Sequence, residues 1–216
     1  MGPFLMNFAS CIVSLFINQQ LKTHGGDLAI GAYGIANRIT FFFLMICMGF
    51  NQGMQPIASY NWGARQYSRV RKVFWLTTGC VTVVTVVCFL VSYLFPHVAV
   101  RLFTEDPTLE EHAIYGLKIM NMAIGIISIN LVASNLYQNL GMVSKSIFLS
   151  LSRQLLILVP LLYLLPLSMN EAGVWYAFPI SDIASCIISL TLITSTLRKF
   201  RNLKDGDEPT MFRSKI

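Results

Sequence analysis

The sequence predicts an all-α integral membrane protein, a six-transmembrane-helix bundle. Three observations indicate this fold class. Hydrophobic residues make up 55% of the 216 residues and charged residues only 12%, whereas a soluble domain carries about 25% charge. The apolar residues gather in six runs, and each run approaches or exceeds the roughly 20 residues that a helix needs to cross a bilayer. The connections between the runs are short and polar, so a large water-facing domain is not expected.

The six runs define the predicted spans in chain order. None shows the alternation of polar and apolar residues over about 10 positions that is typical of a membrane β-strand, which favours helices. The spans are predicted at Phe4–Leu21, Ile30–Ile57, Val73–Phe95, Ala113–Leu136, Ser146–Leu167 and Ala172–Leu197. Residues 1–197 therefore form one six-helix transmembrane lobe, and residues 198–216 form a polar cytoplasmic tail.

The connection after the second span changes character abruptly, in the stretch GMQPIASYNWGARQYSRVRKVFW at residues 53–75. We expect Pro56 to end or kink the second helix. Tyr60, Trp62 and Tyr67 are predicted to lie in the lipid headgroup layer, which aromatic side chains favour. The four cations that follow suit a cytoplasmic loop facing anionic lipid; they are Arg65, Arg69, Arg71 and Lys72.

The distribution of cations predicts the orientation in the membrane. One side holds eleven, namely the four in this connection, Lys145 and six from residue 198 onward. The opposite connections hold three, which are Lys22, Arg101 and Lys118. Lys and Arg accumulate in short cytoplasmic loops, so both termini are expected to be cytoplasmic. A loop held against a bilayer is a poor nucleic-acid site, and we expect no nucleic-acid partner.

Uncharged polar residues form stripes along three of the spans, and polar groups in hydrocarbon must face protein or water. Their spacing places them on one face of each helix. The predicted substrate-cavity residues are Asn7, Ser10, Ser14, Asn18, Asn37, Asn51, Gln55, Asn121, Ser128 and Asn135. The stripes indicate a bundle around a mildly polar interior. The alternative is that they only hold the bundle together, through interhelical hydrogen bonds of about 0.6 kcal/mol each.

Three ionisable residues lie well inside the spans: Arg38, Arg153 and Asp182. A charge in the bilayer costs about 2.5–3.5 kcal/mol on insertion scales, so a partner is expected. With a rise of 1.5 Å per residue, Arg38 and Asp182 lie roughly 12 and 15 Å below the same face. Asp182 can pair with Arg38, or with Arg153 if the fifth helix begins early. The pair is either structural or part of a coupling-ion or proton site.

Known catalytic and metal-binding motifs are absent from the sequence. The five cysteines lie in apolar runs without a C-x-x-C pair, and the three histidines lie in polar connections. We expect no enzymatic activity, no catalytic residue, no metal site and no organic cofactor. An intramembrane hydrolase would need a Ser–His pair or two aspartates within the bilayer, and only Asp182 qualifies. The N-terminus offers no clear cleavage site, so no removable signal peptide is expected.

Four stretches of the sequence carry a family resemblance: GGDLAIGAYGIANRI, GFNQGMQPIASYNWGARQYSRVRKVF, YQNLGMVSKSIFLSLSRQLLILVPLLYLLP and GVWYAFPISDIAS. Together they resemble the second half of MATE (multidrug and toxic compound extrusion) transporters, within the bacterial multidrug-export branch. They occur in the expected order, and the resemblance covers about residues 1–200.

The resemblance implies one lobe of a twelve-helix MATE transporter, in which two six-helix lobes are related by a pseudo-twofold axis. It implies multidrug efflux by antiport against Na⁺ or H⁺ across the bacterial cytoplasmic (inner) membrane. The expected partners are the lipid bilayer, amphipathic or cationic small-molecule substrates, and the missing N-terminal lobe or a second copy. Some relatives carry acidic cation ligands in the helices that match the first and fourth spans, but neither span has an acid here. A coupling carboxylate would therefore come from the other lobe or from Asp182.

Two alternatives remain at this stage. One is a lipid-linked oligosaccharide flippase of the same superfamily, which would need cations in its cavity to meet pyrophosphate. The other is a non-transporting membrane subunit.

Overall fold

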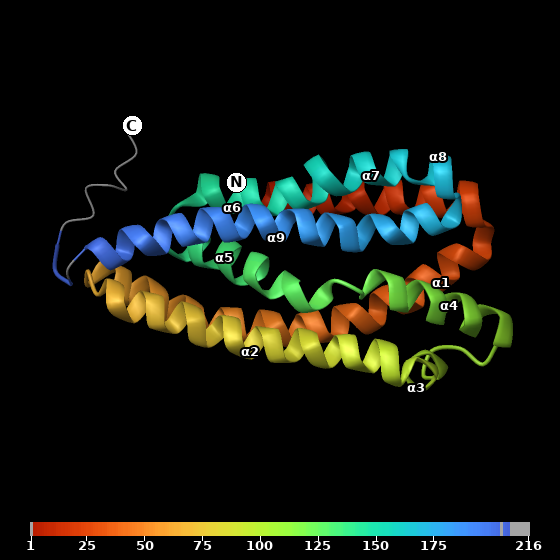
Figure 1. Cartoon of the computed structure of the whole chain (residues 1–216), viewed down its shortest axis with the longest axis horizontal. Helices are drawn as coiled ribbons and strands as arrows, with labels where there is room; N and C mark the ends of the chain where they lie inside the picture. The colour runs from red at the N-terminus through yellow and green to blue at the C-terminus, as the bar shows by residue number, and fades with distance from the viewer. Residues whose placement is uncertain (1, 204, 208–216) are drawn as a thin grey trace.

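The computed structural model of the chain describes residues 2–203 and 205–207, and their side chains from residue 8 onward except at residue 202. Every regular element in these ranges is helical, and Figure 1 shows the longer helices running along one common axis. The elements are α1 (Gly2–Gly63), α2 (Tyr67–Leu94), α3 (Pro96–Arg101), α4 (Pro107–Met120), η1 (Ile124–Ile126), α5 (Ile127–Asn139), α6 (Val143–Leu151), η2 (Ser152–Leu158), α7 (Val159–Leu164), α8 (Pro166–Met169) and α9 (Glu171–Asn202).

The first predicted connection is a sharp bend within α1. Gly26 has φ 72° and ψ −164°, a backbone conformation that residues with a Cβ rarely adopt. Residues 2–25 form the first arm of α1 and residues 27–63 form the second arm. Figure 1 shows the two arms separating at this bend, the first beside α6–α8 and the second beside α2. One glycine therefore replaces the longer connection expected between the first two spans.

The second arm continues beyond the point where the sequence placed its end. The backbone stays helical through Pro56, and α1 ends at Gly63. Of the two outcomes expected at Pro56, an end or a kink of the helix, the first is therefore wrong. The aromatic residues of this region also differ from expectation. Tyr60 is 75% exposed, but Tyr67 is only 1% exposed, because its ring packs at 5.5 Å from Trp62 and 5.9 Å from Phe200.

The fourth predicted span is broken in its middle. α4 ends at Met120, a 3₁₀ turn follows at Ile124–Ile126, and α5 leaves at 41° to α4. Irregular backbone at membrane depth is tolerated where protein covers it. Here the Thr85 hydroxyl of α2 donates to the Gly125 carbonyl at 3.4 Å. The break is thus paired with a neighbouring helix.

The fifth predicted span contains a π-helical turn, η2, at Ser152–Leu158. Pro160 lies two residues after its end, and a proline inside a helix has no N–H for the carbonyl four residues earlier. A wider π turn relieves that loss, and such turns are frequent at functional sites. The span ends at Asn170, which adopts φ 51° before α9 begins.

Four of the described helices are long and apolar enough to span a bilayer, and there are five such spans if the bent pair α4–α5 counts as one. One of the four is α1, which consists of two helices joined at Gly26. Many large apolar side chains also point outward, including Leu15 at 71% and Leu167 at 71% exposure. Outward apolar side chains at this density suit lipid rather than water.

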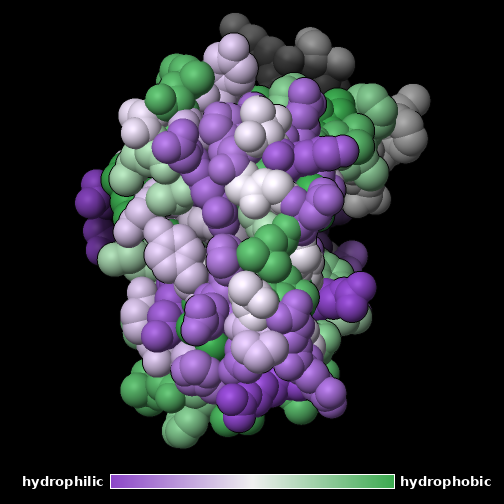
Figure 2. Space-filling model, turned by 90° about the vertical axis from the view of Figure 1, so that its right-hand side faces the viewer, coloured by the Kyte–Doolittle hydropathy of each residue, from purple (hydrophilic) through white to green (hydrophobic). Residues whose placement is uncertain are grey.

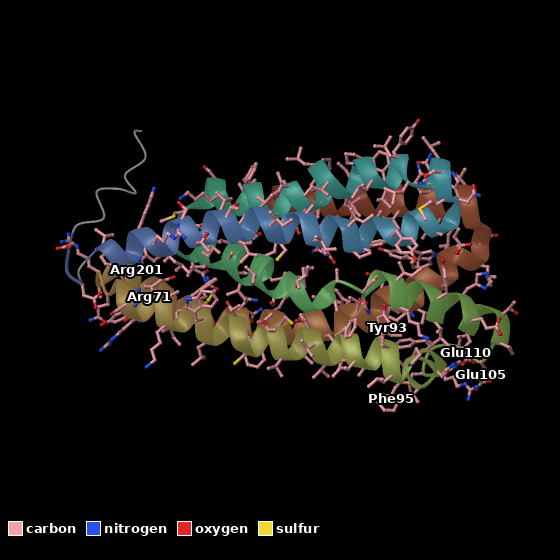
Figure 3. The ribbon with its side chains drawn as sticks, viewed as in Figure 1. Arg71, Tyr93, Phe95, Glu105, Glu110 and Arg201 are labelled. Carbon is pink, nitrogen blue, oxygen red and sulfur yellow. The ribbon has the colours of Figure 1, made fainter. Side chains whose placement is uncertain are left out.

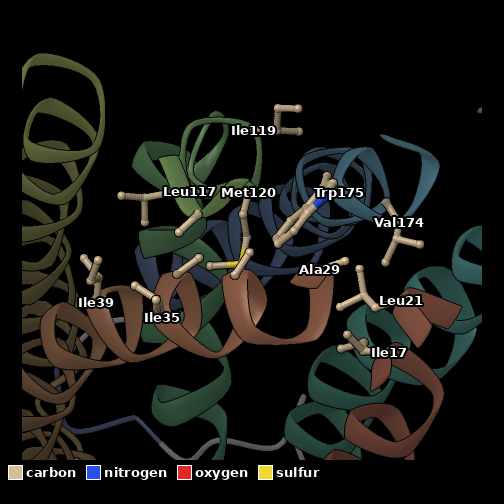
Figure 4. Packing of buried hydrophobic residues seen from close by; sticks show 14 of the residues in the cluster. Ile17, Leu21, Ala29, Ile35, Ile39, Leu117, Ile119, Met120, Val174 and Trp175 are labelled. Atoms are coloured by element: carbon tan, nitrogen blue, oxygen red, sulfur yellow. The ribbon is translucent and has the colours of Figure 1, made fainter. Parts of the chain in front are cut away.

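Two large apolar clusters and a smaller third one, formed by Cys88, Ile124 and Ile127, fill the interior. The first lies near the bend of α1, where Trp175 of α9 packs among Leu21, Ala29, Leu117 and Met120 (Figure 4). The second lies toward the other end of the bundle, and joins α2, α5 and α9; it includes Tyr67, Phe74, Leu136, Tyr137 and Ile193. Between them the clusters fix how the helices are rotated, and so decide which polar side chains meet.

The two ends of the bundle carry different charges. Figure 3 places Arg71 and Arg201 at one end and Glu105 and Glu110 at the other. At the acidic end, Glu110 lies 2.9 Å from His97 and 3.1 Å from Arg101, which ties α4 to α3. Figure 2 looks onto this acidic end and shows hydrophilic side chains gathered over it, with hydrophobic ones mainly toward the margin.

Candidate functional site

A polar pocket of about 240 Å³ lies between the second arm of α1 and α5. It brings together three of the predicted substrate-cavity residues, Asn51, Gln55 and Asn135, from two helices. Its lining consists of Leu44, Cys47, Met48, Asn51, Gln52, Gln55, Leu131 and Asn135. Four amides therefore face an otherwise apolar wall, which suits a ligand with both a polar and an apolar part.

The two asparagines in this pocket have fixed orientations. The Nδ2 group of Asn51 donates to the Cys47 carbonyl at 2.9 Å, and that of Asn135 donates to the Leu131 carbonyl at 2.9 Å. Because only the nitrogen of an asparagine side chain can donate to a backbone carbonyl, these bonds fix which end of each side chain is the nitrogen. The side-chain oxygen of each asparagine takes no part in them. Asn51 is 5% exposed, and its Oδ1 has no partner among the residues that the structure describes. Asn51 Oδ1 is itself buried, so the amides of Asn135, Gln52 and Gln55 are the ones that can accept hydrogen bonds from a ligand.

Gln52 and Gln55 are exposed, and their amides can turn to donate or accept. None of the eight lining residues is charged. The pocket can therefore hold a cationic or neutral amphipathic group without paying for a buried unpaired charge of its own.

A larger hollow, of about 600 Å³, lies between the second arm of α1 and α2. Its lining is almost wholly apolar, with Thr77 and Cys80 as the exceptions among residues such as Ile46, Phe50, Ile57 and Leu76. Such a surface offers little that would distinguish one apolar ligand from another, so the smaller polar pocket is the stronger candidate site.

Two predicted cavity residues take part in interhelical hydrogen bonds. Asn121 accepts from the Thr40 hydroxyl at 3.0 Å and donates to the Ser92 hydroxyl at 2.9 Å, which joins α1, α4 and α2. Ser128 lies 2.9 Å from the Thr82 hydroxyl of α2. Asn121 and Ser128 thus stabilise the broken fourth span, which is the alternative that the sequence left open for the polar stripes.

The remaining cavity candidates lie on α1, away from the polar pocket. Ser10 donates to the Gln154 side chain of η2 at 3.2 Å. Ser14, Asn18 and Asn37 are exposed on the two arms. The side chain of Asn7 lies outside the described residues. The exposed members are free to meet a surface that this chain does not itself supply.

The buried acid of α9 has one cationic partner. The Arg153 Nε lies 2.8 Å from Asp182 Oδ1, with the two side chains 27% and 5% exposed. Arg38, the other predicted partner, is exposed. The π turn η2 carries Arg153 toward α9, and the next residue, Gln154, toward Ser10 of α1. Neighbouring residues of one turn therefore connect three helices.

A polar stripe on α9 was not among the predicted cavity residues. Asn130 of α5 donates to the Ser189 hydroxyl at 2.8 Å, and the Tyr137 hydroxyl lies 2.8 Å from that of Thr196. Both contacts are buried and hold α5 against α9. The available signal was the spacing of residues 182, 185, 189 and 196, which all fall on one face of a helix.

Comparisons with known proteins identify the family. The MatE family model matches residues 2–164. The chain is 27% identical over 194 residues to the multidrug export protein MepA of Staphylococcus aureus strain N315, covering 90% of this chain and 41% of MepA. It is 24% identical over 192 residues to MepA of Staphylococcus haemolyticus, covering 89% of this chain and 42% of that protein.

Solved structures show the same fold. The MATE multidrug transporter DinF-BH, solved with a bound ligand, is 35% identical with a TM-score of 0.81, covering 94% of this chain and 45% of that chain. A MATE crystal structure in the straight conformation is 18% identical with a TM-score of 0.85, covering 92% of this chain and 45% of that one. The chain thus spans less than half the length of these relatives. These matches confirm the resemblance seen in the sequence: the chain belongs to the MatE family of multidrug and toxic compound extrusion transporters, and its helices match about half of that fold.

Proposed function

We propose that this chain is one lobe of an exporter that moves amphipathic or cationic compounds out of the cell in exchange for Na⁺ or H⁺. The observation that carries the proposal is the uncharged amide pocket formed by Asn51, Gln55 and Asn135. Its fixed acceptor oxygens suit ligands with N–H groups, and its apolar wall suits their rings or chains. The names of the MepA relatives, which are multidrug export proteins, support the same assignment.

The transport mechanism is alternating access, in which two lobes rock about a shared cavity. This chain supplies one lobe, and a separate N-terminal lobe or a second copy supplies the other. The exposed Ser14, Asn18 and Asn37 mark the surface of α1 that meets the partner. Facing lipid instead would leave these polar groups without partners in hydrocarbon, which is costly.

The coupling step requires a group that binds H⁺ or Na⁺. Asp182 is the acid that the described spans hold in their buried interior, 2.8 Å from Arg153. Protonation of Asp182 would release Arg153, and so loosen η2 from α9. The coupling carboxylate is therefore Asp182 or an acid of the partner lobe.

The proposed orientation has both termini in the cytoplasm of a bacterial cell, with the chain in the cytoplasmic membrane. The separation of Arg71 and Arg201 from Glu105 and Glu110 at opposite ends of the bundle supports it (Figure 3). The flippase alternative is not favoured. A lipid pyrophosphate would require cations in its binding cavity, and none of the residues that line the polar pocket is cationic.

The test is efflux of ethidium, whose amino groups donate hydrogen bonds, from vesicles that contain the assembled transporter under an imposed Na⁺ or pH gradient. Gln55→Leu and Asn135→Leu should each slow efflux about 5- to 10-fold, the effect of one lost hydrogen bond. Gln138→Leu is the matched control, because Gln138 is exposed on the same helix as Asn135 and lies outside the pocket. Equal rates in all three variants would refute the pocket assignment.

A further inference from the structure

A second small pocket, of about 200 Å³, lies at the cation-rich end of the bundle. It sits where α2 begins and α9 ends, and is separate from the amide pocket. Its lining is Ser68, Arg71, Phe200, Arg201, Leu203 and Asp205. The two arginines come from helices far apart in the sequence, and Figure 3 shows both at this end.

The chain segment that follows α9 forms one side of the pocket, through Leu203 and Asp205. The Gly206 N–H donates to the Arg65 carbonyl at 2.9 Å, and the Tyr67 hydroxyl donates to the Asp207 carbonyl at 2.8 Å. Ser68 donates to the Asp205 carboxylate from its backbone N–H at 3.1 Å and from its hydroxyl at 2.5 Å. These contacts hold residues 205–207 beside the first turn of α2.

The acidic and basic side chains of this pocket differ in whether they have a partner. The hydrogen bonds from Ser68 hold the pKa of Asp205 below its usual value, so this carboxylate is ionised and already has its donors. Arg71 and Arg201 make no ion pair with an acid among the described residues. Two guanidinium groups and one carboxylate thus line the pocket, and the carboxylate is already hydrogen-bonded to Ser68.

Guanidinium groups match the oxygens of a phosphate, because their planar N–H groups form paired hydrogen bonds. Phe200 and Leu203 add an apolar part to the lining. Both helices that form the pocket are membrane spans, so it opens at the level where a span leaves the bilayer. A phospholipid has a phosphate for the arginines and apolar chains for Phe200 and Leu203. Free phosphate has no apolar part.

We propose that this pocket binds the phosphate headgroup of an anionic phospholipid, and that the bound lipid holds the start of α2 against the end of α9. The proposal does not depend on the transport function. It requires only that this end of the bundle lies in a leaflet that contains anionic lipid.

The test uses the purified chain in detergent and native mass spectrometry with phosphatidylglycerol, phosphatidylcholine or inorganic phosphate as the probe. Arg71→Gln with Arg201→Gln should weaken phosphatidylglycerol binding about 100-fold, since a hydrogen bond to a charged group contributes about tenfold or more. The matched control is Lys72→Gln with Arg198→Gln, which removes the same net charge from neighbouring residues outside the pocket. It should change binding less than about threefold, because both arginines of the pocket stay in place and detergent offers no anionic surface on which the removed cations could act.

A third variant separates charge from geometry and guards against misfolding. Arg71→Lys with Arg201→Lys keeps both charges at the surface but loses the paired hydrogen bonds, and should bind phosphatidylglycerol with intermediate affinity. Equal losses in the pocket and control variants would reduce the effect to diffuse surface charge and overturn the proposal. Inorganic phosphate that binds as tightly as the lipid would overturn the assignment to a phospholipid.

Discussion

The guanidinium of Arg153 lies 2.8 Å from the carboxylate of Asp182, and the pair is located between the two charged ends of the bundle. The contact depends on the π turn η2, which begins one residue before Arg153. The following residue, Gln154, accepts a hydrogen bond from Ser10. The ion pair is thus one of two adjacent links that hold the fifth span between α9 and the first arm of α1.

Replacing the buried acid should destabilise the protein if the pair is structural. Asp182→Asn leaves Arg153 without its counter-charge, and breaking a buried pair costs about 3 kcal/mol. The midpoint of thermal unfolding in detergent should fall. Adding Arg153→Gln should partly restore it, while adding Arg38→Gln should not, because Arg38 is exposed. Unchanged stability together with loss of pH-driven export by the assembled transporter would instead assign Asp182 to coupling.

Gly116 should tolerate no larger residue. A Cβ at this position would overlap the ring of Trp175, which is itself fully buried. Gly116→Ala is expected to destabilise the protein by about 1–3 kcal/mol through overpacking. Gly79→Ala is the control, since a Cβ there meets nothing within 4 Å, and it should be neutral or stabilising because alanine favours helix. Equal thermal stability of the two variants would contradict the packing around Trp175.

The predicted cavity residues should separate into two groups by their effects. Asn121→Leu removes the link between Thr40 and Ser92, so unfolding should become easier by about 1–2 kcal/mol. Asn135→Leu removes a pocket amide whose nitrogen bonds only its own helix, so stability should hardly change while ethidium efflux falls. Thermal unfolding and efflux measured on both variants check this division. The reverse pattern would place the substrate at the broken fourth span.

The orientation can be tested by cysteine labelling in a background without the five native cysteines. An impermeant thiol reagent applied to intact cells should modify Thr108→Cys at the acidic end but not Ser68→Cys at the cation-rich end. The reason is that short loops rich in Lys and Arg stay in the cytoplasm. Labelling at position 68 alone would reverse the orientation.

The chain by itself should not export drugs as a monomer. Its exposed Ser14, Asn18 and Asn37 would meet lipid, where unpaired polar groups are costly. Expressed in a host without its own exporters, residues 1–216 should self-associate, join a separate lobe or be degraded. Ethidium efflux and the mass of the detergent-solubilised particle are the measurements. Cation-driven efflux from a particle of one chain's mass would contradict this expectation, whereas a particle of two chains would show that two copies replace the two lobes.

The helical membrane fold and the family could be predicted from the amino-acid sequence. Apolar length and the sign of charge in each connection are local properties of the chain, and the bilayer acts on them directly. The spacing of polar residues predicted that Asn51, Gln55 and Asn135 face a cavity, and all three line one pocket. The sequence also showed that Asp182 needs a cationic partner, because an unpaired charge in hydrocarbon is costly.

Which of these residues meet depends on the packing of the helices against one another. The choice of Arg153 over Arg38 follows from the π turn η2, which has no simple signature in the sequence. The continuation of α1 past Pro56 and the break after Met120 likewise depend on packing against neighbouring helices. A helix pattern fixes the face on which a side chain lies, but rotation and depth relative to other helices are set by long-range contacts such as those around Trp175. Partner choice is therefore a property of the packed bundle, and the individual spans do not contain it.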